Sequence, residues 1–286
     1  MYKIATKKVL NKSVTQMEIE APLVANKAKA GQFIILRVDE EGERIPLTVA
    51  GTDKESGTVK IIFQTVGLTT MKLAEKNEGE YISDFAGPLG TPTHTEGIKN
   101  VCIIGGGVGC AIAMPVAEEF KKLGAKVTSI IGFRNKDIVI LEDEFKSISD
   151  ELRIMTDDGS YGEKGNVTMP LKEYLENGGK FDMIIAIGPV IMMKFVVETA
   201  KPYGVPVTVS MNPIMIDGTG MCGGCRLTLN QEGKKVTKFA CVDGPDFNGY
   251  EVDFDEAMSR GRMYFDFERH AYETTCNLFK GGSENG

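Results

Sequence analysis

Histidine is scarce in this sequence, long apolar runs are absent, and basic residues form no cluster. The 286 residues include only two histidines, His94 and His270, and no G-x-S-x-G element accompanies either one, so a nucleophilic triad is excluded. The longest uncharged run, residues 101–117, contains four glycines and a proline and is too short to span a bilayer comfortably. A net charge of −7 with scattered lysines and arginines argues against nucleic acid or an anionic membrane as the main partner.

The N-terminal residues also lack the pattern of a secretory signal. Lysines in MYKIATKKVLNKS are not followed by an apolar stretch. Six cysteines without such a signal indicate metal or redox chemistry rather than a disulfide framework. We therefore expect a cytoplasmic protein with no membrane association and no nucleic-acid partner.

Residue patterns divide the chain into three segments. Residues 1–97 contain short β-branched runs separated by glycine or acidic turns, which predicts a small β barrel of about six strands. Residues 98–211 alternate apolar strands with amphipathic helices, which predicts a doubly wound, mostly parallel α/β domain. In residues 212–286, glycine and cysteine crowd together ahead of a polar tail, so a small metal-binding domain is expected there.

The third segment contains the pattern with the most specific chemistry, D-x4-C-x2-C-x15-C, formed by Asp217, Cys222, Cys225 and Cys241. Plant-type 2Fe-2S ferredoxins use C-x4-C-x2-C and a distant fourth cysteine, so Asp217 stands where the first thiolate belongs. The alternatives are a zinc knuckle or a metal-free cysteine hairpin, but zinc sites normally have two paired elements and this chain has one. Cys276, in the polar tail, is an alternative fourth ligand if the tail folds back, but it is expected to be a spare thiol.

A glycine-rich turn at residues 105–110, GGGVGC, directly follows the apolar strand pattern VCII and opens a helix pattern. In that context, glycines let a dinucleotide pyrophosphate approach the backbone and the helix N-terminus. The alternative is a tight turn without a ligand, and Cys110 replaces the third glycine of the motif. After the next strand, Arg134 and Lys136 suit a 2′-phosphate whereas Asp137 suits a ribose diol, so both NAD(H) and NADP(H) stay open.

Three short motifs in the first segment together supply what a flavin needs, although each alone is compatible with a turn between strands. They are AGQF at 30–33, ERIPLTVAG at 43–51 and VGLTT at 66–70. Arg44 offers charge for a pyrophosphate and Thr48 offers a hydroxyl for a ring nitrogen. Residues 67–70 offer backbone amides at a predicted helix start.

In this order, the motifs resemble the ferredoxin-reductase superfamily, and within it the electron-transfer subunits related to that of dihydroorotate dehydrogenase. The likeness covers nearly the whole chain, through residues 44–48, 87–90, 105–115, 156–168, 187–189 and the cysteine loop. The resemblance implies that FAD is held by Arg44, Pro46, Leu47, Thr48, Gly67, Thr69 and Thr70. It also implies that NAD(H) lies along Gly105, Gly107, Gly109 and Gly188.

Two departures refine this resemblance. Ile187 stands where family members often have cysteine, and Asp217 replaces the first of the four cysteines of the dihydroorotate-linked subunits. The run DGTGMCGGC, with residues 242–254 after it, is instead similar to the small subunits of NADH-dependent reduced ferredoxin:NADP oxidoreductases. That likeness implies an oxidoreductase subunit with FAD, NAD(H) and an Asp/Cys3 2Fe-2S cluster. It also implies a larger partner subunit with a second flavin, two 4Fe-4S clusters and the NADP(H) and ferredoxin chemistry of electron bifurcation.

Because the cofactors carry the chemistry of such a subunit, no catalytic acid or base is expected among the side chains. Two other functions stay open at this point. One is the electron-transfer subunit of dihydroorotate dehydrogenase, which shares everything except the Asp ligand and the tail. The other is a zinc-stabilised nucleotide-binding module without a redox role.

Overall fold

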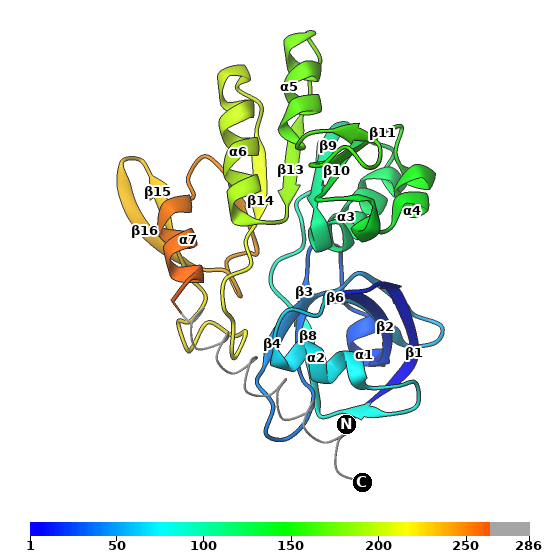
Figure 1. Cartoon of the computed structure of the whole chain (residues 1–286). Helices are drawn as coiled ribbons and strands as arrows, with labels where there is room; N and C mark the ends of the chain where they lie inside the picture. The colour runs from blue at the N-terminus through cyan, green and yellow to red at the C-terminus, as the bar shows by residue number, and fades with distance from the viewer. Residues whose placement is uncertain (264–286) are drawn as a thin grey trace.

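The computed structural model describes residues 1–263 of the chain (Figure 1). His270 and Cys276 lie outside the described residues. The N-terminal segment folds into two antiparallel sheets. The five-stranded sheet has the order β5 (Gly51–Asp53), β6 (Thr58–Gln64), β2 (Val14–Glu20), β1 (Tyr2–Asn11) and β7 (Tyr81–Ile82). The three-stranded sheet has the order β4 (Ile45–Thr48), β3 (Phe33–Arg37) and β8 (Asp84–Leu89).

A shared apolar core holds these two sheets together. Met17 and Ile61 of the larger sheet and Ile34 and Leu36 of the smaller sheet are completely buried in one cluster. Alternation along each strand turns these side chains to the same interior, and each contributes about 1.5–3 kcal/mol on burial. Two short helices, α1 (Pro22–Ala25) and α2 (Leu68–Glu75), complete the segment. It has eight strands where about six were predicted.

The second segment is built on a seven-stranded sheet. Its order is β12 (Glu163–Lys164), β11 (Glu151–Thr156), β10 (Lys126–Phe133), β9 (Asn100–Gly106), β13 (Met183–Ile187), β14 (Val207–Ser210) and β17 (Asp246–Asn248). The first six strands are parallel, and β17 is antiparallel to β14. The predicted doubly wound, mostly parallel α/β fold is therefore confirmed.

Helices cover both faces of this sheet because alternate residues of its strands are apolar on both sides. Val101 and Ile103 of β9 pack with α3 (Cys110–Lys122) and α4 (Glu142–Ile148). Cys102 and Ile104 pack on the opposite face with α5 (Thr168–Glu176) and α6 (Val190–Ala200). The chain leaves β9 for β10 on one side and reaches β13 on the other, so the end of β9 is a topological switch point.

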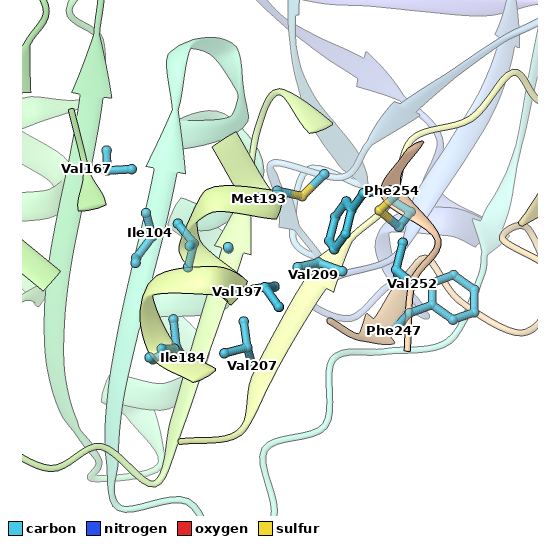
Figure 2. Close-up of a cluster of buried hydrophobic side chains, with 14 of the residues drawn as sticks. Ile104, Val167, Ile184, Met193, Val197, Val207, Val209, Phe247, Val252 and Phe254 are labelled. Atoms are coloured by element: carbon cyan, nitrogen blue, oxygen red, sulfur yellow. The ribbon is translucent and has the colours of Figure 1, made fainter. Parts of the chain in front are cut away.

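The third segment adds a hairpin of β15 (Arg226–Gln231) and β16 (Lys234–Phe239), followed by β17 and α7 (Phe254–Gly261). Val252 and Phe254 belong to one buried cluster with Met193 of α6 and Val209 of β14 (Figure 2). This segment thus contributes both an edge strand and core side chains to the α/β sheet. The strand β17 joins that sheet from beyond residue 211, where the sequence places a domain boundary.

The connection between the first two segments is tied to the third. Thr91 donates two hydrogen bonds to the carbonyl oxygen of Gly244, from its amide at 2.7 Å and from its hydroxyl at 3.0 Å. The hydroxyl of Thr93 donates to Oδ2 of Asp246 at 2.6 Å. These bonds fix the three segments at one junction. Across residues 1–263, no helix has the length and apolar character needed to cross a membrane.

Candidate functional site

The glycine turn lies at the switch point of the α/β sheet. Gly105 ends the strand β9 with Gly106, residues 107–109 form a 3-10 turn, and Gly109 is the N-cap of α3. Gly107 has φ +56°, and a Cβ there would meet no atom within 4 Å. The turn therefore needs glycine for its left-handed backbone and leaves open space above it. The amide of Cys110 donates to the carbonyl oxygens of Gly107 and Val108, and a helix start that follows an open glycine turn is a common place for an anion to bind.

Two loops meet at this turn, and the contact brings the predicted NAD(H) glycines together. A Cβ on Gly109 would lie 2.5 Å from the carbonyl oxygen of Ile187 and 2.7 Å from Cα of Gly188. A Cβ on Gly188 would lie 3.1 Å from Cα of Gly106. The loops after β9 and β13 thus touch backbone to backbone, which makes a small residue necessary at each position. Cys110, in the third-glycine position, is fully buried at the start of α3.

The loop after β10 contains the residues expected to determine whether the chain binds NAD(H) or NADP(H). Arg134 is exposed, and it forms no ion pair with any of the described residues. The ammonium group of Lys136 lies over the ring of Tyr161, 5.6 Å from its centroid, in a cation–π geometry. The side chain of Asn135 caps a short turn, because its Oδ1 accepts a hydrogen bond from the amide of Asp137 at 3.1 Å. Both charge signs are present at the carboxyl end of β10.

The proposed flavin residues follow the pairing of β3 with β4. Pro46, Leu47 and Thr48 lie opposite Ile35, Ile34 and Phe33 in that ladder. Arg44 precedes the strand, and its Nη2 lies 3.7 Å from Oδ2 of Asp84.

Asp84 belongs to β8, and its Oδ2 also lies 2.8 Å from Nε of Arg37. Two guanidinium groups thus share one carboxylate, which leaves a net positive charge beside β4, as a pyrophosphate needs. Arg37 and Asp84 were not among the residues predicted from the sequence. Their positions at the end of β3 and the start of β8 become meaningful only when the two strands pair.

The helix start after β6 is built around Thr70. Its hydroxyl accepts hydrogen bonds from the amides of Val66 at 3.0 Å and Gly67 at 3.1 Å, and donates to the carbonyl of Gly67 at 2.9 Å. Gly67 is the N-cap of α2, and Thr69 is buried in the first turn. The Thr70 hydroxyl is therefore occupied by the cap, and the first-turn amides stay available to a ligand.

The cysteine loop brings two of the four predicted ligands into contact. Cys225 and Cys241 are buried, with 1% and 2% of their surface exposed, and their sulfur atoms lie 3.1 Å apart, farther than the 2.05 Å or so of a disulfide. Cys222 is exposed. Oxygens of Asp217 accept hydrogen bonds from the amides of Thr219 at 2.6 Å and Cys222 at 2.7 Å. Among residues 1–263, no three Cys, His, Asp or Glu side chains are gathered as a metal site.

The chemistry of these donors fits an iron–sulfur cluster. Burial and the adjacent Cys225 thiol raise the pKa of Cys241 to about 12. A bound metal deprotonates its thiol ligands. Two thiols as close together as Cys225 and Cys241 can therefore both bind one metal centre. Hydrogen bonds from the Thr219 and Cys222 amides lower the pKa of Asp217, which keeps its carboxylate charged. Gly218 and Gly220 have φ +76° and +83°, and these positive φ values bend the loop around the cysteines.

The cysteine loop lies directly on the sheet that contains the flavin residues. A Cβ on Gly218 would lie 2.6 Å from Cδ1 of Leu89 and 2.8 Å from Cδ1 of Ile35. Ile35 and Phe33 also share a buried cluster with Cys225 and Cys241. On the other side of the molecule's first segment, the turn at 107–109 packs beside β6. The flavin segment therefore contacts both the dinucleotide turn and the cysteine loop.

Comparison with known proteins identifies the family. The model for the iron–sulfur cluster binding domain of dihydroorotate dehydrogenase B matches residues 212–253. The dihydroorotate dehydrogenase B (NAD(+)) electron transfer subunit homolog of Thermotoga maritima is 47% identical over 270 residues, which cover 94% of each chain. This chain belongs to the family of dihydroorotate dehydrogenase B-type electron-transfer subunits.

Solved structures agree with this family. A chain of the NADH-dependent reduced ferredoxin-NADP oxidoreductase, described for flavin-based electron bifurcation, is 46% identical with a TM-score of 0.89, covering 96% of this chain and 98% of that one. An Amycolatopsis cytochrome P450 reductase, 20% identical with a TM-score of 0.60 over 71% of this chain and 65% of that one, shares the fold alone.

These comparisons confirm the predicted family, fold class and oxidoreductase role in electron transfer. The predicted cofactors, FAD, NAD(H) and an iron–sulfur cluster, agree with this fold and this family model. Members of the family are electron-transfer subunits, so a second subunit is part of the expected assembly. The individual ligand residues and the boundaries at 97 and 211 stay predictions.

Proposed function

We propose that this chain is the NAD(H)-linked electron-transfer subunit of an NADH-dependent reduced ferredoxin:NADP oxidoreductase. The observation that carries the proposal is the 46% identity to a chain of that enzyme over 98% of its length, with a TM-score of 0.89. In this role, the chain passes electrons between NAD(H), FAD and a 2Fe-2S cluster. None of the five described cysteines forms a disulfide, which supports a cytoplasmic location.

Each segment has a separate task in this proposal. Residues 1–97 hold FAD, residues 98–211 hold NAD(H), and residues 212–286 hold the cluster and the tail. When bound, FAD supplies the ability to exchange an electron pair with the nicotinamide and single electrons with the cluster. The residues of the chain bind and orient these groups. Arg44 neutralises the flavin pyrophosphate, and the amides after Gly107 receive that of NAD(H).

The cluster ligands in this proposal are Asp217, Cys222, Cys225 and Cys241. The 3.1 Å approach of two of the thiols and the proximity of the loop to β3 support this assignment. The exposed Cys222 and the Asp217 carboxylate would supply the other two ligands. A carboxylate in place of a thiolate makes the site harder and alters the reduction potential.

The partner in this proposal is a larger subunit with its own flavin and 4Fe-4S clusters, and with the NADP(H) and ferredoxin chemistry. The described residues contain one dinucleotide turn, one flavin region and one cysteine loop, so electrons that reach the cluster need an acceptor outside the chain. Met221 lies at the surface of the cysteine loop with 89% of its area exposed, and Ile216 and Val242 are also exposed. These apolar side chains beside the proposed cluster favour docking of the partner there.

Native co-purification with metal analysis and coupled assays tests the function. We expect the chain to contain iron and flavin, to reduce artificial dyes with NADH, and to couple NADPH, NAD and ferredoxin only with its larger subunit. Zinc in place of iron would support the zinc-stabilised nucleotide-binding module. Coupled turnover with all three substrates by the isolated 286-residue chain would refute the subunit assignment.

A second candidate is the electron-transfer subunit of dihydroorotate dehydrogenase. The family model over residues 212–253 and the description of the Thermotoga maritima relative favour it. Co-purification with a dihydroorotate-oxidising subunit, together with dihydroorotate-dependent reduction of NAD, would establish this alternative.

A further inference from the structure

Two arginines bind the backbone between the paired cysteines. Gly223 and Gly224 are the two residues between Cys222 and Cys225. Nη1 of Arg226 donates to the carbonyl oxygen of Gly223 at 3.3 Å, and Nη2 of Arg260 donates to that of Gly224 at 3.3 Å. Each carbonyl of the C-x2-C turn is thus held by a guanidinium group.

The two arginines come from different elements. Arg226 is the first residue of β15, whereas Arg260 lies in the last turn of α7. Figure 1 shows α7 beside the β15–β16 hairpin. Phe254 fixes the start of α7 in the buried cluster with Met193 and Val209 (Figure 2). The core of the α/β sheet therefore sets the position of Arg260 relative to the cysteine turn.

Neither arginine forms an ion pair within the part of the chain that the structure describes. Lys235 and Lys238 of the same hairpin pair with Asp253 at 3.0 Å and Asp243 at 3.2 Å. The ion pairs that residues 1–263 form through arginine involve Arg37, Arg44 and Arg153 instead. A guanidinium group stays protonated at any pH at which the protein folds. Two positive charges therefore act on the turn that contains Cys222 and Cys225.

We propose that Arg260 and Arg226 are positioning residues that set the reduction potential of the cluster, in addition to holding its loop. This inference rests on the proposed 2Fe-2S site. Reduction adds one electron, which NADH supplies through the flavin, and no bond to either arginine forms or breaks. The reduced cluster is more negative by one charge, so a nearby positive charge stabilises the reduced form and raises the potential. Arg260 is half-buried and Arg226 is exposed, so the charge of Arg260 is screened less.

Four variants of the full chain, loaded with its cofactors, test this role. Arg260→Gln and Arg226→Gln remove one charge each while keeping a side-chain amide donor, and Arg260→Lys keeps the charge. The control, Lys234→Gln, removes a charge at the far end of the same hairpin. Lys234 pairs with Gln231, five residues along β15 from Arg226, a distance of roughly 17 Å. That is beyond the Debye length of about 8–10 Å in ordinary buffers.

The measurement is a redox titration of the cluster followed by its EPR signal, after the iron content of each variant has been determined. In Arg260→Gln, we expect the equilibrium constant for reduction of the cluster to fall about tenfold. This corresponds to a reduction potential that is lower by about 59 mV for one electron. Arg226→Gln should show a smaller decrease in the same direction. Arg260→Lys and Lys234→Gln should match the unmodified chain.

A purely structural role for the arginines predicts a different result. The potential would then be equal in Arg260→Gln, Arg226→Gln and Lys234→Gln wherever iron is retained, and that result would overturn the inference. If Arg260→Gln loses its iron, a lower potential in Arg226→Gln supports the inference and an unchanged one overturns it. Absence of a 2Fe-2S cluster from the unmodified chain would instead overturn the proposed function on which the inference rests.

Discussion

Gly109→Ala tests the contact between the two loops of the proposed NAD(H) site. The new Cβ would lie 2.7 Å from Cα of Gly188, whereas carbon atoms normally approach to about 3.5 Å, so the loops must separate by roughly 0.8 Å. The atoms that the new Cβ would meet belong to the backbone, so no change of side-chain rotamer can relieve the clash. Overpacking of this kind costs about 1–3 kcal/mol of stability. A displacement near 1 Å in a positioning element can reduce a rate by about 100-fold, so we expect a 10- to 100-fold loss here.

The assay is rapid-mixing reduction of the bound flavin at low NADH concentration, beside reduction by dithionite, which needs no nucleotide site. The matched control is Gly124→Ala, just after α3. Gly124 has φ +81°, and a Cβ there would meet no atom within 4 Å. The substitution therefore costs only the roughly 1–2 kcal/mol that a non-glycine residue loses in the left-handed conformation. Gly109→Ala should react slowly with NADH and normally with dithionite, whereas Gly124→Ala should lose stability alone. An unchanged NADH rate constant in Gly109→Ala would refute the reasoning.

Three further predictions concern the cluster, the coenzyme and pH. Asp217→Ala should lose iron, whereas Asp217→Cys should keep a cluster of altered potential, because thiolate is the softer donor; a normal EPR signal in Asp217→Ala would exclude the carboxylate as a ligand. Flavin reduction should be faster with NADH than with NADPH at matched concentrations; the opposite order would identify Arg134 as a phosphate ligand. Burial raises the pKa of Asp246 above the unfolded value near 3.9, so protonation favours the folded chain. The free energy of unfolding of the unmodified chain should therefore fall, relative to that of Asp246→Asn, as pH rises from about 4 through the raised pKa. Urea midpoints that change with pH by the same amount in both proteins would contradict this.

The parts of the fold that the sequence predicts best are those with a strong local pattern. The predicted strands at 183–187 and 127–133 match β13 and β10, because a strand buried on both faces is mostly apolar. The first segment has eight strands instead of about six, and strands such as β5 and β7, with three and two residues, are too short to show alternation. The predicted helix start at residues 67–70 is present because the N-cap pattern is local.

The candidate site was predictable only where its residues are close in sequence. The spacing of Cys222 and Cys225 indicates a metal loop, and Cys241 does meet Cys225 in the structure. The contact between Gly109 and Gly188 joins two loops 79 residues apart, and no local pattern reveals it. The same holds for the bond from Arg260 to the cysteine turn, because it depends on how α7 packs on the α/β core.

The pairing of β17 with β14 has a consequence for any truncation of this chain. The cysteine segment supplies the outermost strand of the nucleotide sheet, so a cut at residue 211 would remove that strand together with the loop. The amide and carbonyl groups that Thr208 to Ser210 present to β17 would then be bare, and a bare edge invites pairing with other chains. A recombinant or ancestral chain that lost its iron–sulfur segment would have to cap this edge anew. We therefore expect that the cluster segment cannot be removed from this chain without exposing the edge of its nucleotide sheet.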